Sequence, residues 1–104
     1  MKKCPVELVK LMRLLYNLTP TEAEIFSFMC GNKLTVKELS ALTMKERSVV
    51  QKILQKLYSL GLVKRSKEGK EFYYSLEDTK KVKKILRKKL SEEVKKMRKI
   101  IEML

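Results

Sequence analysis

Hydrophobic residues recur at helical spacing along most of the chain and divide it into short segments. Pro5 opens a run of leucines spaced three and four residues apart, which predicts a helix over residues 4–17. A second helix follows the stretch 19–22, Thr-Pro-Thr-Glu, where a capping hydroxyl precedes a proline and, three residues on, a glutamate. Gly31 ends this second helix. Its apolar face consists of Ile25, Phe26, Phe28 and Met29.

The same capping pattern occurs twice more and predicts a central pair of helices. The stretch 35–38, Thr-Val-Lys-Glu, opens a short third helix just after a minimal strand at Leu34. The stretch 43–46, Thr-Met-Lys-Glu, opens a fourth helix over residues 44–59, which ends before Gly61. The inward face of this fourth helix is expected to comprise Val50, Ile53, Leu54, Leu57 and Leu60.

Beyond the fourth helix the hydrophobic period changes from helical to alternating. Residues 62–66 and 71–76 read as two short strands around a turn at 67–70, which predicts a β-hairpin. Because a single hairpin is marginally stable by itself, we expect Phe72 and Tyr74 to pack it against the fourth helix.

One long helix is predicted over residues 78–104. Its apolar residues form a narrow stripe at intervals of three and four, which is typical of a coiled-coil seam. A small domain cannot bury the whole stripe, so we expect a second copy of the chain to cover it in a homodimer. The alternative is that the helix folds back on its own domain. The expected dimerisation residues are Leu86, Leu90, Val94, Met97, Ile101 and Leu104.

The chain has 104 residues, a length that fits a single domain. Its charge indicates which kinds of partner it could bind. There are 25 Lys and Arg against 12 Asp and Glu, giving a formal net charge of +13. Such an excess favours a polyanion, with nucleic acid ahead of an anionic membrane surface. Apolar runs fall well short of the roughly 20 residues of a membrane span, so we expect no membrane association and a cytoplasmic location. Lys and Glu richness also fits a thermophile.

Catalytic chemistry has little support in the sequence. Histidine is absent, Asp78 is the only aspartate, and the glycines stand singly, so we expect a protein that is not an enzyme and uses no metal or cofactor. The two cysteines do not form a C-x-x-C motif. We expect Cys30 to be a buried small hydrophobe and Cys4 a free thiol. Since the first two helices are expected to pair antiparallel, a disulfide between Cys4 and Cys30 is the alternative.

Four short sequence motifs follow one another along the chain between residues 18 and 76. They are Leu18-Thr19 with Glu22, Lys37-Glu38-Leu39, Arg47-Ser48-x-Val50, and the pattern LxxLxxxGLV from Leu54 to Val63. This combination resembles the small winged helix-turn-helix transcriptional regulators of the MarR, ArsR and TrmB-like kind, in their compact archaeal form. The resemblance implies a mostly α fold with a small β-hairpin wing, flanked by an N-terminal helix and a long C-terminal dimerisation helix. The chain departs from that pattern in one turn, where Met44 and Lys45 stand in place of a glycine and an apolar residue.

The outer face of the predicted fourth helix carries amide, hydroxyl and cationic groups, including the only two glutamines of the chain, Gln51 and Gln55. These groups match base edges in the DNA major groove. We therefore expect a sequence-specific, dimeric transcriptional regulator of double-stranded DNA, a repressor rather than an activator, that adds backbone or minor-groove contacts through a wing at 64–72. The expected contacts are Lys45, Arg47, Ser48, Gln51, Lys52 and Gln55 on the recognition helix, and Thr35, Arg65, Lys67 and Lys70 on the wing and backbone side.

Two alternatives remain at the level of the sequence. The first is a nonspecific, chromatin-like protein that coats DNA, and the second is a winged-helix module that binds another protein. The operator sequence and any small-molecule effector leave no pattern that we can read.

Overall fold

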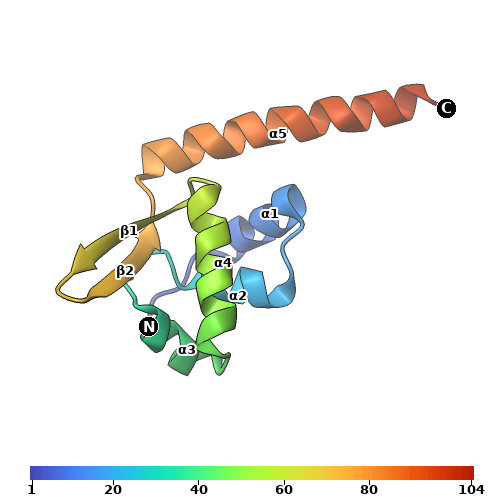
Figure 1. The fold of residues 1–104 in the computed structure, drawn as a ribbon. Coiled ribbons are helices and arrows are strands. Elements are labelled where there is room, and N and C mark those ends of the chain that lie inside the picture. Colours follow the sequence, from blue (N-terminus) through green and yellow to red (C-terminus); the bar gives the residue numbers. More distant parts are fainter.

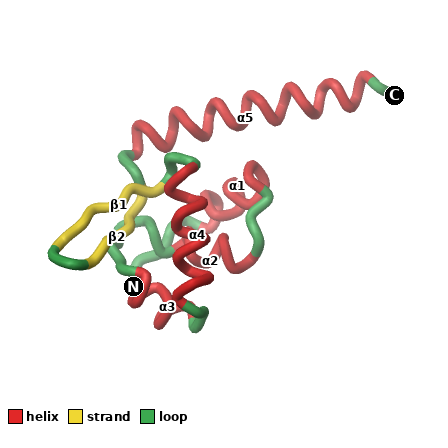
Figure 2. Tube along the Cα trace, in the orientation of Figure 1, coloured by secondary structure: helices red, strands yellow, loops and turns green.

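The computed structural model describes all residues from 1 to 104 and contains five helices and one antiparallel hairpin (Figure 1). The mostly α architecture with a hairpin wing confirms the fold class predicted from the sequence. Figure 2 shows the helices, strands and connections along the chain. In order, the elements are α1 (Val6–Tyr16), α2 (Pro20–Ser27), α3 (Val36–Thr43), α4 (Arg47–Ser59), β1 (Val63–Glu68), β2 (Glu71–Leu76) and α5 (Thr79–Glu102).

A single apolar core joins the helices and the root of the wing. The predicted inward residues of α2 and α4 are buried in it, except that Leu60 is half-buried, and Phe26, Leu54 and Leu57 are fully inaccessible to solvent. Helix α2 ends at Ser27 and not at Gly31 as predicted, so Phe28 and Met29 enter the core from the segment after the helix. Tyr74 of β2 is also buried, and it is the largest of the fully buried side chains. Truncating a buried leucine of this kind to alanine costs about 2–5 kcal/mol. The core therefore fixes α4 by one face and leaves the other face of the helix outside.

Two of the three predicted capping boxes are present. The Thr19 hydroxyl accepts a hydrogen bond from the Glu22 N–H (3.2 Å), and the Glu22 carboxylate accepts one from the Thr19 N–H (2.9 Å). Thr35 and Glu38 make the same reciprocal pair at 3.1 and 3.0 Å. These boxes confirm the predicted starts of α2 and α3.

The third predicted capping box, at residues 43–46, is wrong, and α4 starts at Arg47 instead of residue 44. Thr43 is the last residue of α3, where it is buried and its hydroxyl donates to the Leu39 carbonyl at 2.7 Å. That bond within α3 removes the hydroxyl from any capping role. Met44 then ends α3 in the left-handed region, at φ 55°, and Glu46 precedes α4 without a side-chain cap.

The wing is longer than predicted and is tied to the segment before α3. Its register runs from Val63 opposite Leu76 to Glu68 opposite Glu71, with Gly69 at φ 63° in the turn. As predicted, Leu34 forms a minimal strand. The expected packing of both aromatic residues on α4 is only half right, because Phe72 is 43% exposed while Tyr74 is buried. Phe72 lies closer to the wing tip, outside the apolar core.

The long C-terminal helix leaves the body of the molecule after its first turns. Val82 is buried, and Ile85 and Leu86 are the last α5 residues that pack against the core. Beyond them α5 projects as an arm, which makes the molecule 54 × 27 × 22 Å (Figure 1). The alternative expected from the sequence was that this helix folds back on its own domain. The structure does not show this, because only the first turns of α5 pack against the core.

A disulfide joins Cys4 to Cys30, so the expectation of a free Cys4 thiol is wrong. Cys4 is buried, whereas Cys30, which was expected to be buried, is only half-buried. The reason is that α1 begins at Val6, which leaves Cys4 in an extended segment outside the helix. The Cys4 N–H donates to the Ser27 carbonyl at 2.7 Å and brings this segment against the end of α2.

Candidate nucleic-acid interface

The polar face of α4 is open to solvent. Arg47, Ser48, Lys52 and Gln55 are exposed, and Gln51 between them is half-buried. Helix α4 stands between the wing on one side and α2 on the other, with contacts to both (Figure 1). Neither neighbour covers the polar face, so the side chains predicted to contact bases are brought together on one unobstructed surface. Lys45 is exposed in the loop just before α4.

Gln51 is held at the base of this surface. Its amide Nε2 donates to the Tyr74 hydroxyl at 3.5 Å, a long and weak bond that restrains the amide without occupying its oxygen. Gln51 also borders a shallow cavity of about 150 Å³ between α3, α4 and β2. The rim of this cavity carries Lys37, a cation that we did not assign to the site from the sequence.

Thr35 does not present its side chain to the outside. It is buried, with 6% of its surface exposed, and its hydroxyl is occupied by the Glu38 N–H. The side chain of Thr35 therefore gives little support to the expected contact with the DNA backbone, which stays a prediction. The hydroxyl keeps its own O–H donor, but a side chain that is buried and engaged in a helix cap has little surface to offer to DNA.

The wing presents an exposed basic surface next to α4. Arg65, Lys67 and Lys70 are all exposed, as expected. The Arg65 guanidinium carbon lies 4.6 Å from the ring centre of Tyr58 and 5.0 Å from that of Phe72, and the Lys67 ammonium lies 5.8 Å from the Phe72 ring centre. Tyr58 had no role in the sequence analysis, although its spacing from Gln51 and Gln55 places it on the same face of α4.

The positive charge of this surface is not neutralised within the chain. The ion pairs are Lys33–Glu68, Lys56–Glu22, Lys89–Glu93 and Lys96–Glu93. None of them uses a residue predicted to contact DNA, so the cations of α4 and the wing keep their charge for an external anion.

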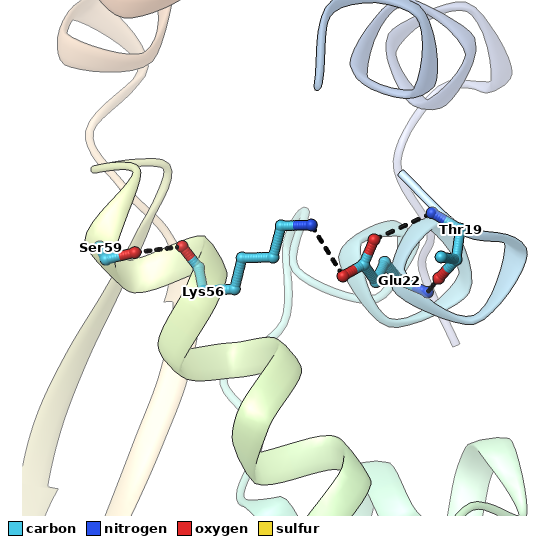
Figure 3. A network of polar contacts seen from close by, with 4 residues as sticks. All are labelled: Thr19, Glu22, Lys56 and Ser59. Atoms are coloured by element: carbon cyan, nitrogen blue, oxygen red, sulfur yellow. Dashed lines mark hydrogen bonds and ion pairs between the residues drawn. The ribbon is translucent and has the colours of Figure 1, made fainter. Parts of the chain in front are cut away.

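A polar network fixes α4 against α2 on the side away from the wing (Figure 3). The Lys56 ammonium lies 2.9 Å from the Glu22 carboxylate, which also closes the Thr19 capping box. Burial raises the pKa of Glu22, but the hydrogen bond from Lys56 and those from Thr19 outweigh it, so the pKa lies below its usual value. The ionised carboxylate is therefore the form that holds the two helices together.

The predicted dimerisation residues lie along α5. Leu86 packs against the core, whereas Leu90, Met97, Ile101 and Leu104 are between 48% and 107% exposed. Val94 is half-buried. Large apolar side chains exposed along one stripe of a projecting helix are costly to leave in water.

The structure holds no group of three or more His, Cys, Asp or Glu side chains that would bind a metal ion. Its helices include none with the length and apolar composition needed to cross a membrane.

Residues 12–80 match the family model described as "Sugar-specific transcriptional regulator TrmB". This range includes the second half of α1 from Met12 on, all of α2, α3 and α4, and the whole wing. Among curated proteins, none matches the sequence significantly.

Several solved structures share the fold. A possible transcriptional regulator from Methanosarcina mazei Go1 matches with a TM-score of 0.74 at 17% identity over 92% of this chain and 87% of its own. ST1889 from the thermoacidophilic archaeon Sulfolobus tokodaii matches with a TM-score of 0.69 at 25% identity over 88% and 92%. A homodimeric winged helix-turn-helix DNA-binding domain from Mycobacterium bovis, a possible ArsR-family regulator, has a TM-score of 0.59 at 17% identity over 84% and 82%. These likenesses show a winged-helix fold.

Proposed function

We propose, since the chain belongs to the TrmB family of transcriptional regulators, that it recognises a specific sequence in double-stranded DNA by placing α4 in the major groove. The observation that carries this proposal is the open polar face of α4 beside a basic wing. A major groove admits an α-helix, and its base edges present donors and acceptors in a pattern that differs for each base pair.

The side chains of α4 divide into two roles. Ser48, Gln51 and Gln55 carry hydroxyl and amide groups, which hydrogen-bond base edges, and a good bidentate pair discriminates by about 1–3 kcal/mol. Arg47 and Lys52 flank them and are suited to phosphates, although arginine also pairs with guanine. Lys45 precedes the helix and adds a further cation.

The wing supplies contacts that do not depend on sequence. Arg65, Lys67 and Lys70 extend along one hairpin, and we propose that they meet the DNA backbone or the minor groove next to the site read by α4. Each phosphate that a wing cation neutralises releases about one counterion, so this part of the affinity falls steeply with salt.

We propose that the active form is a homodimer built on α5. The exposed stripe of that helix needs an apolar partner, and a second copy offers the same stripe in a two-fold arrangement. The related domain from M. bovis is described as homodimeric. A two-fold dimer sets its recognition helices about one DNA turn apart and reads a roughly palindromic site.

We further propose that binding represses transcription in the cytoplasm. A dimer seated on a promoter blocks polymerase by occupancy alone, whereas activation needs an additional contact with polymerase. A reporter gene behind the selected site should be silenced when the protein is expressed, and increased output would reverse this assignment.

Selection of bound sequences from a random duplex pool tests the proposal as a whole. We expect enrichment of an inverted repeat with half-sites about 10 base pairs apart. Enrichment of a single half-site would contradict the dimer. A pool that stays random while the protein binds it would favour nonspecific coating of DNA, and absence of binding would favour a protein-interaction module.

A further inference from the structure

Two exposed aromatic rings from different elements lie close to the cationic group of Arg65. Tyr58 belongs to α4 and Phe72 to β2, and their ring centres lie 4.6 and 5.0 Å from the Arg65 guanidinium carbon. Both distances are inside the roughly 6 Å range of an attractive cation–π contact. The two rings are 44% and 43% exposed, so they do not belong to the core. We call this pair the aromatic seat of Arg65.

The sequence brings these three side chains together by simple periodicities. Tyr58 follows Gln51 by two helical turns, which places it at the C-terminal end of the polar face of α4. On the wing, Arg65 is directly opposite Tyr74, and Phe72 lies two residues from Tyr74 on the same face of β2. The seat therefore sits at the junction between the recognition helix and the wing.

Stacking leaves the binding groups of Arg65 available. A guanidinium ion contacts a ring through its flat face, while its N–H donors point outward along the edge. Arg65 has no ion pair within the chain. Glu68, the acid of β1, lies three residues away and therefore on the opposite face of the strand, where it pairs with Lys33. Its charge is therefore held in place without being neutralised.

We propose that Tyr58 and Phe72 are positioning residues that hold Arg65 ready to bind a DNA phosphate between the site of α4 and that of the wing. This inference rests on the proposed function. An arginine on an exposed strand normally loses side-chain freedom when it binds, and a seat that orders it beforehand removes part of that loss. The seat thus raises affinity for every duplex alike and leaves base preference to α4.

Binding to the selected duplex and to a random duplex, measured by fluorescence anisotropy, tests the inference. Tyr58→Leu and Phe72→Leu should each weaken both affinities about two- to fivefold, the range of one exposed cation–π contact. Tyr58→Phe keeps the ring and should bind like the wild type. Tyr73→Leu removes the neighbouring ring on the opposite face of β2 and is the matched control, for which we expect no change.

The double variant decides whether the rings act through Arg65. In an Arg65→Ala background, Tyr58→Leu should cause no further loss, because the group that it positions is gone. A loss of the same size in both backgrounds would overturn the inference, and so would equal weakening by Tyr58→Phe and Tyr58→Leu. Thermal unfolding of each variant shows that the fold is kept.

A readout in the free protein separates this inference from the proposed function. In the wild type, NMR relaxation of the Arg65 Nε–Hε group should show a more rigid side chain than in Tyr58→Leu. Equal mobility in both would overturn the seat even if DNA binds. Failure of the wild type to bind any duplex, with a rigid Arg65, would overturn the proposed function and with it the DNA role of the seat.

Discussion

The Lys56 ammonium lies 2.9 Å from the Glu22 carboxylate and joins α4 to the first turn of α2. Glu22 serves two purposes at once, because its other oxygen accepts the Thr19 N–H and completes the capping box (Figure 3). The helix that is proposed to read DNA is thereby fixed by a polar contact on one side and by the core on another.

Replacing Glu22 by Gln should show how much the negative charge of Glu22 contributes to the free energy of unfolding. Glutamine can still close the capping box, so the loss is confined to the pair with Lys56. Because Lys56 is 44% exposed, we expect the free energy of unfolding at pH 7 to fall by less than about 1 kcal/mol. Urea unfolding measures this difference, with Glu24→Gln as the control for removal of a nearby acid.

The effect of Glu22 should depend on pH in one direction. Its pKa is lowered in the folded protein, so its stabilisation is complete above the unfolded value of about 4.3 and is lost as pH falls through the folded pKa. Unfolding free energies of the wild type and Glu22→Gln should therefore converge as the pH falls through the lowered pKa of the folded protein. A difference that grows toward acid pH would contradict this role.

Met44→Gly should stabilise the turn between α3 and α4. Met44 has φ 55° and is 91% exposed, so its side chain strains the backbone and contributes little packing. Relief of the left-handed strain, about 1–2 kcal/mol, exceeds the added flexibility of glycine in the unfolded chain, which leaves a net gain of up to about 1 kcal/mol. Thermal unfolding tests this gain. Lys45→Gly, at the next position without a positive φ, should not stabilise the protein.

Loss of the disulfide should destabilise the protein strongly. Cys4 and Cys30 are 26 residues apart, and a loop of that length corresponds to about 3.5 kcal/mol of chain entropy. Cys30→Ser should lower the free energy of unfolding by about that amount. A thiol reductant should lower the stability of the wild type to the level of the variant and leave the variant unchanged. If the reductant changes the unfolding curve of neither protein, the disulfide does not contribute to stability.

Gln51→Ala and Lys67→Ala should weaken DNA binding in different ways. The first removes a base-reading amide and should cost about 1–3 kcal/mol on the selected site, with little effect on random duplex. The second removes a backbone cation and should weaken both duplexes equally while lowering the salt slope by about one. Affinities at several salt concentrations separate the two patterns. Identical behaviour of the two variants would remove this division of roles.

A charge placed in the α5 seam should break the proposed dimer. Met97→Glu puts a carboxylate on the exposed apolar stripe, where burial in a dimer would be costly. Sedimentation should show a monomer for this variant and a dimer for the wild type. Lys99→Glu adds the same group on the opposite side of α5 and should remain dimeric. A wild type that sediments as a monomer at micromolar concentration would contradict the α5 interface.

Much of the fold could be predicted because its signals are local. The capping boxes at Thr19 and Thr35 and the apolar face of α4 depend on residues three and four positions apart, and the structure confirms them. The start of α4 was missed because Thr43 has two local uses for its hydroxyl, and burial within α3 decided between them. The spacing of apolar residues does not show which of these two hydrogen bonds the hydroxyl makes.

The remaining errors concern contacts between residues that are far apart in the sequence. The Cys4–Cys30 bridge depends on an extended segment that turns back onto α2, and the exposure of Phe72 depends on how far the core reaches along the wing. The outer face of α4 could be assigned from sequence because it is the complement of the apolar face. The spacing also places Tyr58 on that face, but its role could not be predicted, because the sequence does not show that Arg65 of the wing lies beside it.

The central claim is that the polar face of α4 reads bases. The most direct measurement is the ratio of affinities for the selected duplex and for random duplex of the same length at one salt concentration. We predict a ratio of about a thousand or more, which Gln51→Ala should reduce. A ratio near one for the wild type would contradict the claim.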